Sequence, residues 1–117
     1  MPWFKIDDNF AFHRKTVAAG NNAIGLWTRA GAWSAGQLTD GHVPADIVKV
    51  LGGKPTDARK LVEVGLWEVD PAGGYRFHQW NDEDRQPKRS DVEAKRAEWR
   101  ARKARSRAGG QREEQAQ

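Results

Sequence analysis

The residues best suited to chemistry are cations near the carboxyl-terminal end of the chain. Guanidinium and ammonium groups bind phosphate oxygens, and a protein that neutralises several phosphates binds nucleic acid with a steep dependence on salt. Such contacts add affinity with little sequence preference. A helix whose charges are merely solvated is the alternative interpretation. The candidate residues are Arg89, Lys95, Arg96, Arg100, Arg102, Lys103, Arg105 and Arg107.

A second, smaller set of polar residues lies in the middle of the chain. Arginine can read guanine through two hydrogen bonds, whereas lysine and threonine more often contact phosphate. Glu63 would repel phosphate from the same helix face, so a solvated face is an equally good interpretation of Arg59 and Lys60. The candidate contacts are Lys54, Thr56, Arg59 and Lys60 on a helix, with Arg76 and His78 on a hairpin.

Other reactive residue types lack the spacing that their chemistry requires. Asp82, Glu83 and Asp84 are adjacent in a polar stretch and do not converge as metal-binding carboxylates must. The three histidines have no metal-ligand spacing. The stretch GGKPT lacks the spacing of a P-loop, and GAWSAG has no glycine two residues before Ser34. We therefore expect a protein without catalytic residues, metal or cofactor.

The charge is distributed unevenly along the 117 residues. Residues 1–84 hold 9 Lys and Arg against 11 Asp and Glu, a net charge of −2. Residues 85–117 hold 11 Lys and Arg against 5 Asp and Glu, a net charge of +6, so the whole chain has a formal charge of +4. A basic tail on a nearly neutral domain indicates a polyanionic partner.

Composition also bears on the compartment. The chain has no cysteine, which excludes disulfides and suits a reducing interior. No apolar run approaches the roughly 20 residues of a membrane span, and the first residues lack the pattern of a signal peptide. We expect a cytoplasmic protein without a membrane partner.

Two helices are expected at the start of the chain. Residues 7–9 can cap the first, which ends at Gly20, because glycine is favoured just beyond a helix end. The asparagines that follow can cap the second, in which Gly25 and Gly31 indicate close packing or an early end. The apolar face of this second helix consists of Ala23, Leu26, Trp27, Ala30 and Trp33.

Two shorter helices and a β-hairpin should follow. The stretch PADIVKVLGG begins with a proline in its first turn, and KPTDARKLVEVG can be capped by Thr56. The preceding QLTDGHVP is a turn or a short extended piece. Beyond Gly65 the apolar period changes to two, in residues 67–69 and 75–77, on either side of the turn PAGG. The inward face of the second of these helices consists of Ala58, Leu61, Val62 and Gly65.

This order is that of a winged helix-turn-helix domain, which we place at residues 1–80. A polar linker is expected at 81–89, a basic helical tail at 90–108 and a disordered end at 109–117. The tail helix opens with a capping box of Ser90 and Glu93. Trp99 can stack on an unpaired base, but docking of the tail helix against the domain or a partner is the preferred interpretation. A stripe of small residues runs along this helix, at Ala94, Ala97, Ala101, Ala104 and Ala108.

Several motifs together resemble a known family. They are WFKIDDNFAFHRK, GLWTRAGAW with LTDGHVP, ARKLVEVGLWE, and GYRFHQW followed by QP. They are similar to motifs of the small winged-helix proteins of actinobacterial phages, known as helix-turn-helix DNA-binding or replication-initiation proteins. The resemblance covers residues 3–89. It implies a role near phage DNA replication, in origin binding or helicase loading, with a recognition helix at 56–64 and a wing at 66–80.

The sequence therefore predicts a mostly α-helical protein with a small β-hairpin, a winged helix-turn-helix domain and a basic C-terminal helix. Its expected function is non-enzymatic binding of double-stranded DNA in the cytoplasm of a bacterial host. Two alternatives stay open. One is a transcriptional regulator that uses the same surface, and the other is an interaction module that binds a helicase, another replisome protein or a host protein. A homodimer along the alanine stripe also stays open.

Overall fold

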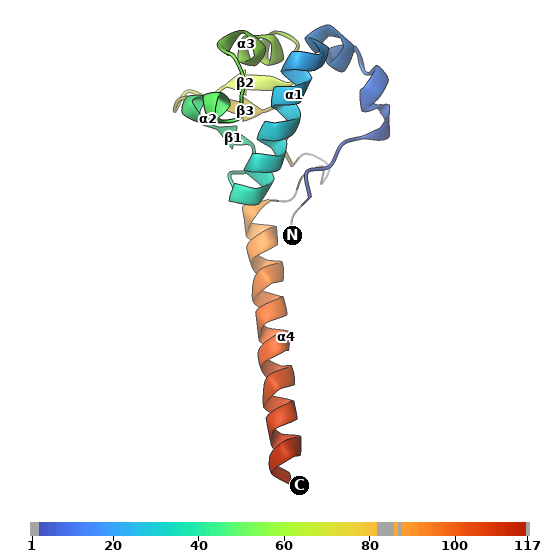
Figure 1. Cartoon of the computed structure of the whole chain (residues 1–117), viewed down its shortest axis with the longest axis vertical. Coiled ribbons are helices and arrows are strands. Elements are labelled where there is room, and N and C mark those ends of the chain that lie inside the picture. Colours follow the sequence, from blue (N-terminus) through green and yellow to red (C-terminus); the bar gives the residue numbers. More distant parts are fainter. Residues whose placement is uncertain (1–2, 82–85, 87, 117) are drawn as a thin grey trace.

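The chain folds into a small domain from which one long helix projects (Figure 1). The computed structural model describes residues 3–81, 86 and 88–116, with side chains described as far as Arg107. The expected class, mostly helical with a small antiparallel sheet, is confirmed. The elements in order are η1 (Asp8–Phe12), α1 (Arg14–Gln37), β1 (His42–Val43), α2 (Ala45–Val50), α3 (Pro55–Glu63), β2 (Trp67–Val69), β3 (Tyr75–Phe77) and α4 (Arg89–Ala116).

The three strands form one antiparallel sheet in the order β1-β3-β2. β2 and β3 make the predicted hairpin, with Trp67 opposite Phe77. The expectation of a turn or short extended piece before Pro44 was incomplete, because β1 pairs with the other edge of β3 and sets Val43 opposite Tyr75. This third strand satisfies backbone groups that the hairpin alone would leave unpaired.

The first helix differs from the expectation in where it begins. The Asp7 carboxylate accepts a hydrogen bond from the backbone N–H of Asn9 at 2.8 Å and caps η1, a 3-10 helix. α1 starts only after His13, and it bends at Gly20, whose φ of 80° and ψ of 166° are not helical. The predicted break at Gly20 is therefore a bend within one element. The two asparagines that follow it lie inside α1.

The glycines of α1 play different roles. A Cβ at Gly31 would lie 2.3 Å from the Phe4 ring, so the close packing predicted there is confirmed. No heavy atom lies within 4 Å of a Cβ at Gly25, and the helix continues to Gln37, so Gly25 neither packs closely nor ends the helix. Of the predicted apolar face, Trp33 is half-buried and the buried residues are Ala23, Leu26, Trp27 and Ala30.

α3 begins one residue earlier than predicted. Pro55 occupies its first position, which suits the fixed φ of proline. Thr56 therefore lies inside the helix, and its predicted role as the cap is wrong. The Asp57 carboxylate instead accepts the backbone N–H of Lys54 at 3.0 Å. The predicted inward face is buried at Ala58 and Leu61 and half-buried at Val62 and Gly65.

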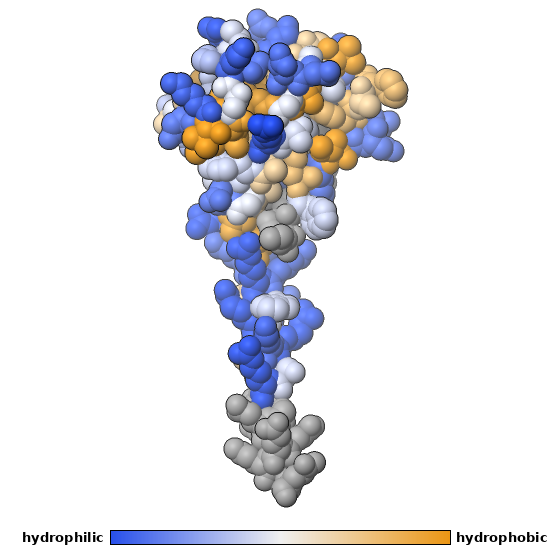
Figure 2. Space-filling view, viewed as in Figure 1, coloured by the Kyte–Doolittle hydropathy of each residue, from blue (hydrophilic) through white to orange (hydrophobic). Residues whose placement is uncertain are grey.

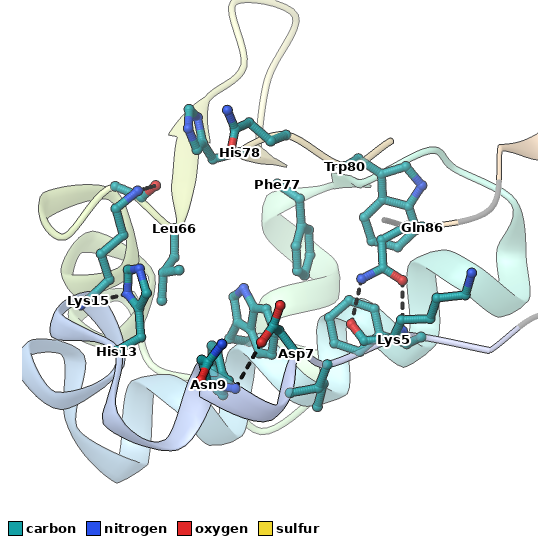
Figure 3. Close-up of a pocket in the computed structure, with 16 residues that line it drawn as sticks. Lys5, Asp7, Asn9, His13, Lys15, Leu66, Phe77, His78, Trp80 and Gln86 are labelled. Carbon is teal, nitrogen blue, oxygen red and sulfur yellow. Dashed lines mark hydrogen bonds between the residues drawn. The ribbon is translucent and has the colours of Figure 1, made fainter. Parts of the chain in front are cut away.

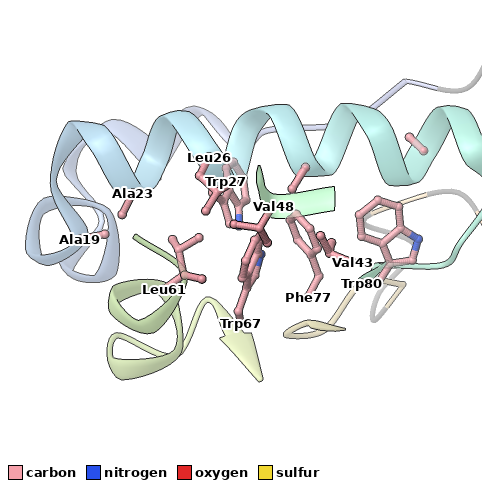
Figure 4. Packing of buried hydrophobic residues seen from close by; sticks show 13 residues of the cluster. Ala19, Ala23, Leu26, Trp27, Val43, Val48, Leu61, Trp67, Phe77 and Trp80 are labelled. Carbon is pink, nitrogen blue, oxygen red and sulfur yellow. The ribbon is translucent and has the colours of Figure 1, made fainter. Parts of the chain in front are cut away.

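Aromatic rings join the helices to the sheet (Figure 4). The centroid of the Phe77 ring lies 5.9 Å from Trp27, 5.6 Å from Trp67 and 5.2 Å from Trp80. Leu61 of α3 is fully buried in the same cluster. Because such rings bury large apolar areas, a few of them suffice for the core of a small domain.

α4 leaves the domain near the carboxyl-terminal end of α1 and points away from it (Figure 1). The backbone N–H of Arg89 donates to the Asp40 carboxylate at 2.6 Å, and Val92, in the first turns, is buried. The molecule measures 67 Å along its longest axis, against 30 and 22 Å along the others. The projecting helix accounts for this elongated shape.

The boundaries of the tail also differ from the expectation. α4 covers the predicted helix at 90–108, but its backbone stays helical to Ala116, where the sequence predicted a disordered end. Arginine, glutamate, glutamine and alanine favour helix, and extending an existing helix needs no new nucleus. Within the predicted linker, residues 82–85 and 87 lie outside the described residues, and Gln86 is buried.

Candidate nucleic-acid interface

The predicted contacts around α3 are exposed, as the interpretation requires. Lys60 Nζ lies 3.6 Å from Glu63 Oε2, one turn further along the helix. An exposed pair of this kind is worth only about 0.3–0.5 kcal/mol, so Lys60 can exchange Glu63 for a phosphate at little cost. Glu63 itself still repels phosphate from this face. The exposed candidates at α3 are Lys54, Thr56, Arg59 and Lys60.

A shallow groove of about 390 Å³ runs between α3 and the bend of α1. Thr56, Asp57 and Lys60 line one side of it, and Asn21 and Asn22 line the other. Asparagine can donate and accept hydrogen bonds at once, as in its pairing with adenine. Sequence analysis treated these asparagines only as helix caps, because nothing local indicates that the bend at Gly20 places them beside α3.

The hairpin holds its arginine through a buried carboxylate. Asp70, which is 7% exposed, accepts hydrogen bonds from the Ala72 backbone N–H at 2.9 Å and from Arg76 Nη2 at 3.2 Å. Its second oxygen also lies 3.0 Å from Nδ1 of His42 on β1. The Ala72 N–H, with help from Arg76 and His42 and against the effect of burial, holds the pKa of Asp70 below its ordinary 3.8.

The second hairpin candidate is also paired. His78 Nδ1 lies 2.7 Å from Glu68 Oε1, and both side chains are exposed. Arg76 on β3 and His78 just after it thus each lie beside a carboxylate of the same hairpin. Because the partner of Arg76 is buried, Arg76 can release Asp70 for a phosphate less easily than Lys60 can release Glu63, so Arg76 offers a weaker anion site than the sequence suggested.

The predicted cations of the tail all lie on α4, and four of them share one face of the helix. Arg96, Arg100, Lys103 and Arg107 follow one another at intervals of four, three and four residues, so they share one face of the helix. We call these four residues the basic stripe. In the part of the chain that the structure describes, no carboxylate lies within ion-pair distance of them. Figure 2 shows hydrophilic side chains along this helix.

The remaining tail candidates lie outside the stripe. Arg89 is engaged at the base of α4, where its Nε donates to Glu93 at 2.9 Å and this hydrogen bond raises the pKa of Arg89. The other three, which are exposed and point to other faces of the helix, are Lys95, Arg102 and Arg105.

Trp99 lies at the edge of the basic stripe. Its side chain is 59% exposed, and Lys103 Nζ lies 4.6 Å from the centroid of its ring. A cation held over an indole keeps both groups available on the same surface. The expectation that Trp99 docks the tail on the domain is not met, since every described side chain from 93 to 107 is exposed.

The two groups of candidate residues lie far apart. α3 lies at one end of the domain, and α4 leaves from the other end of the domain (Figure 1). The α3 candidates therefore lie close to one another, and the stripe residues lie close to one another. The two groups do not share one surface.

A second hollow, of about 600 Å³, lies between the N-terminal arm (residues 3–12), the start of α1 and the end of β3 (Figure 3). Its floor is made of Phe4, Phe10, Trp27, Leu66, Phe77 and Trp80. Its polar rim includes Lys5, Asp7, Asn9, His13, Lys15, His78 and Gln86. An apolar floor with a polar rim is typical of a site for a small ligand or for a partner's side chain.

Gln86 fixes the arm that forms one wall of this hollow. Its Oε1 accepts the Lys5 backbone N–H at 2.8 Å, and its Nε2 donates to the Lys5 carbonyl at 2.7 Å. On the opposite wall, Lys15 Nζ donates to the Gly65 carbonyl at 3.3 Å. The sequence offered no local signal for this hollow, because its walls come from segments up to 81 residues apart.

No family model, curated protein or solved structure matches the chain. Within the described residues, no three or more His, Asp and Glu side chains are placed to hold a metal ion. The helices of the described part include none with the length and apolar character to cross a membrane.

Proposed function

We propose that the protein binds DNA without catalysing a reaction, and that α4 provides most of the affinity. The observation that carries this proposal is the basic stripe, four cations on one face of a helix that projects from the domain. Each cation that neutralises a phosphate releases a condensed counterion, which favours binding at low salt. Residues 1–80 hold 9 Lys and Arg against 8 Asp and Glu, which leaves the domain a smaller electrostatic share.

We infer that the domain is a winged helix-turn-helix unit with α3 as its recognition helix. The element order α1, β1, α2, α3, β2, β3, with the sheet order β1-β3-β2, supports this assignment. In such a unit the exposed face of the second helix enters the major groove. Thr56, Arg59 and Lys60 would then contact DNA and give orientation and sequence preference.

The proposed setting is phage DNA replication in the cytoplasm of the host, as an origin-binding or helicase-loading component. This part of the proposal rests on the resemblance of residues 3–89 to the phage proteins. A transcriptional regulator would use the same surface, and a dimer bound to a palindromic site would identify it instead.

The test of this function is binding of labelled duplexes by fluorescence anisotropy at several salt concentrations. We expect the wild-type affinity to fall steeply with salt. Replacing Arg59 and Lys60 together by alanine should reduce sequence preference. The control, Lys5→Ala with Arg14→Ala, removes the same charge from residues outside α3. If the α3 variant keeps both affinity and preference, the groove assignment is wrong, and salt-insensitive binding would exclude the role of the stripe.

The second candidate function is binding of a partner protein at the hollow beside the N-terminal arm. Ile6, which lines this hollow, is an exposed apolar side chain. The arm and the start of α1 carry three more exposed apolar side chains, Trp3, Phe12 and Val17. In Figure 2, hydrophobic residues gather on the side of the molecule where the arm lies, and a second group lies on the opposite side of the domain. A helicase captured from nuclease-treated lysate by the wild type, but not by a Phe12→Ser variant, would support this function.

A further inference from the structure

Two cationic surfaces of this molecule lie at opposite ends. α3 packs against α1 beside the bend at Gly20, where Lys60 and Asn22 line one groove. α4 starts beyond the other end of α1, where Arg89 is bonded to Asp40. α1 therefore separates the recognition surface from the base of the tail.

The base of α4 is fixed to the domain, and the stripe lies well beyond it. The Arg89 N–H to Asp40 bond and the buried Val92 attach the first turns of α4 to the domain, and two bonds to Lys5 attach Gln86. With a rise of 1.5 Å per residue, Lys103 lies about 21 Å beyond Arg89 along the helix. The stripe thus lies well away, along the molecule, from any DNA that contacts α3.

The domain between the two surfaces offers DNA little attraction. Residues 1–80 hold 9 Lys and Arg against 8 Asp and Glu, a net charge of +1 that is spread over the whole domain. A duplex lying along the whole molecule would cross this nearly neutral surface without gaining further phosphate contacts there. Two separate DNA segments, one at each end, use the cationic residues of both surfaces.

We propose that one molecule bridges two DNA segments, with α3 contacting one segment and the basic stripe of α4 contacting the other. The inference rests on the proposed function, because both surfaces must bind DNA. It goes beyond that function, since binding by a recognition helix and a tail does not by itself join two duplexes. The activity is the bringing together of two DNA segments by the full chain.

Bridging can be measured by energy transfer between two short duplexes, one with a donor and one with an acceptor dye. Duplexes of about 12 base pairs are about 41 Å long, shorter than the molecule, which makes simultaneous contact of both surfaces with one duplex difficult. We expect energy transfer to rise as protein is added and to fall when excess protein gives each duplex its own molecule.

Two variants and a control separate the surfaces. Arg59→Ala with Lys60→Ala should keep binding to a single duplex through α4 but lose most of the energy transfer. Arg96→Gln, Arg100→Gln and Arg107→Gln together should also lose the energy transfer. Lys5→Ala with Arg14→Ala should keep it.

Three results would overturn the inference. If single duplexes bind in the anisotropy assay but show no energy transfer, the proposed function stands and bridging is wrong. If the Arg59 and Lys60 variant keeps the energy transfer, two associated copies join the duplexes through their α4 helices instead. If no duplex binds in the anisotropy assay at low salt, the proposed function fails, and bridging fails with it.

Discussion

The basic stripe makes a quantitative prediction about salt. Arg96 and Arg107 lie about 16 Å apart along α4, and a DNA strand carries one phosphate per 3.4 Å of its axis, so each stripe cation can find its own phosphate. Replacing Arg96, Arg100 and Arg107 together by glutamine removes three such contacts. Because glutamine is a good helix former, α4 should remain helical, which circular dichroism can check.

The expected loss can be estimated from the number of contacts. Each phosphate contact contributes about 0.9 to the slope of log K against log salt for duplex DNA, so the triple variant should lose about 2.7 from its slope. Between 50 and 200 mM salt, the affinity of the variant should consequently fall about 40-fold less than that of the wild type. Fluorescence anisotropy titrations at four or five salt concentrations measure both quantities.

The matched control removes three charges from the other faces of the helix. Lys95→Gln, Arg102→Gln and Arg105→Gln give the same net charge, but these residues lie outside the stripe. If DNA contacts the stripe, this control should change the slope by less than about 1. Equal changes in the two triple variants would mean that total charge, rather than one face of α4, governs binding, and the reasoning from the stripe would be refuted.

Three further predictions concern the stability of the domain. Asp70→Asn should lower the melting temperature at neutral pH. The pKa of Asp70 is lowered in the folded state, so the contribution of its carboxylate to stability is present above pH 3.8 and is lost as the pH falls further. Below pH 3.8, the melting temperature of the variant should therefore depend less on pH than that of the wild type. An identical pH dependence in both proteins would contradict this. Gly31→Ala should destabilise the domain by about 1–3 kcal/mol in urea unfolding, because the Phe4 ring must move. Gly25→Ala should instead stabilise it by up to about 1 kcal/mol. Equal effects of the two substitutions would show that the Phe4 ring can move without an energetic cost. Gln86→Ala should lower the free energy of unfolding by about 1–2 kcal/mol and speed hydrogen exchange at the Lys5 amide, because both backbone groups of Lys5 lose their partner. Unchanged exchange would show that the arm is held by its aromatic side chains alone.

Local signals were enough to predict α3 and the hairpin. The proline of KPTDARK, the glycine at the end of that stretch, and the change of apolar period around PAGG each act within a few residues. Propensity, capping and turn geometry depend on such neighbours, so the sequence shows them directly. The error at Thr56 has the same origin, since two adjacent residues compete to start one helix.

Contacts between distant segments could not be predicted in this way. Gln86 binds Lys5 across 81 residues, and β1 pairs with a strand that no local pattern connects to it. The pairing of Arg76 with Asp70 depends on a turn that points the carboxylate back toward the strand. The sequence therefore predicted which cations the chain has, but not which of them its own carboxylates already hold.

The exposure of α4 has a consequence for how such a chain can change over generations. Every described side chain from 93 to 107 lies in solvent, so a substitution there alters charge without disturbing the core. Asp70 and Gly31, by contrast, are constrained by neighbours on several elements. Mutation can therefore lengthen, shorten or recharge the projecting helix while the folding of the domain stays the same.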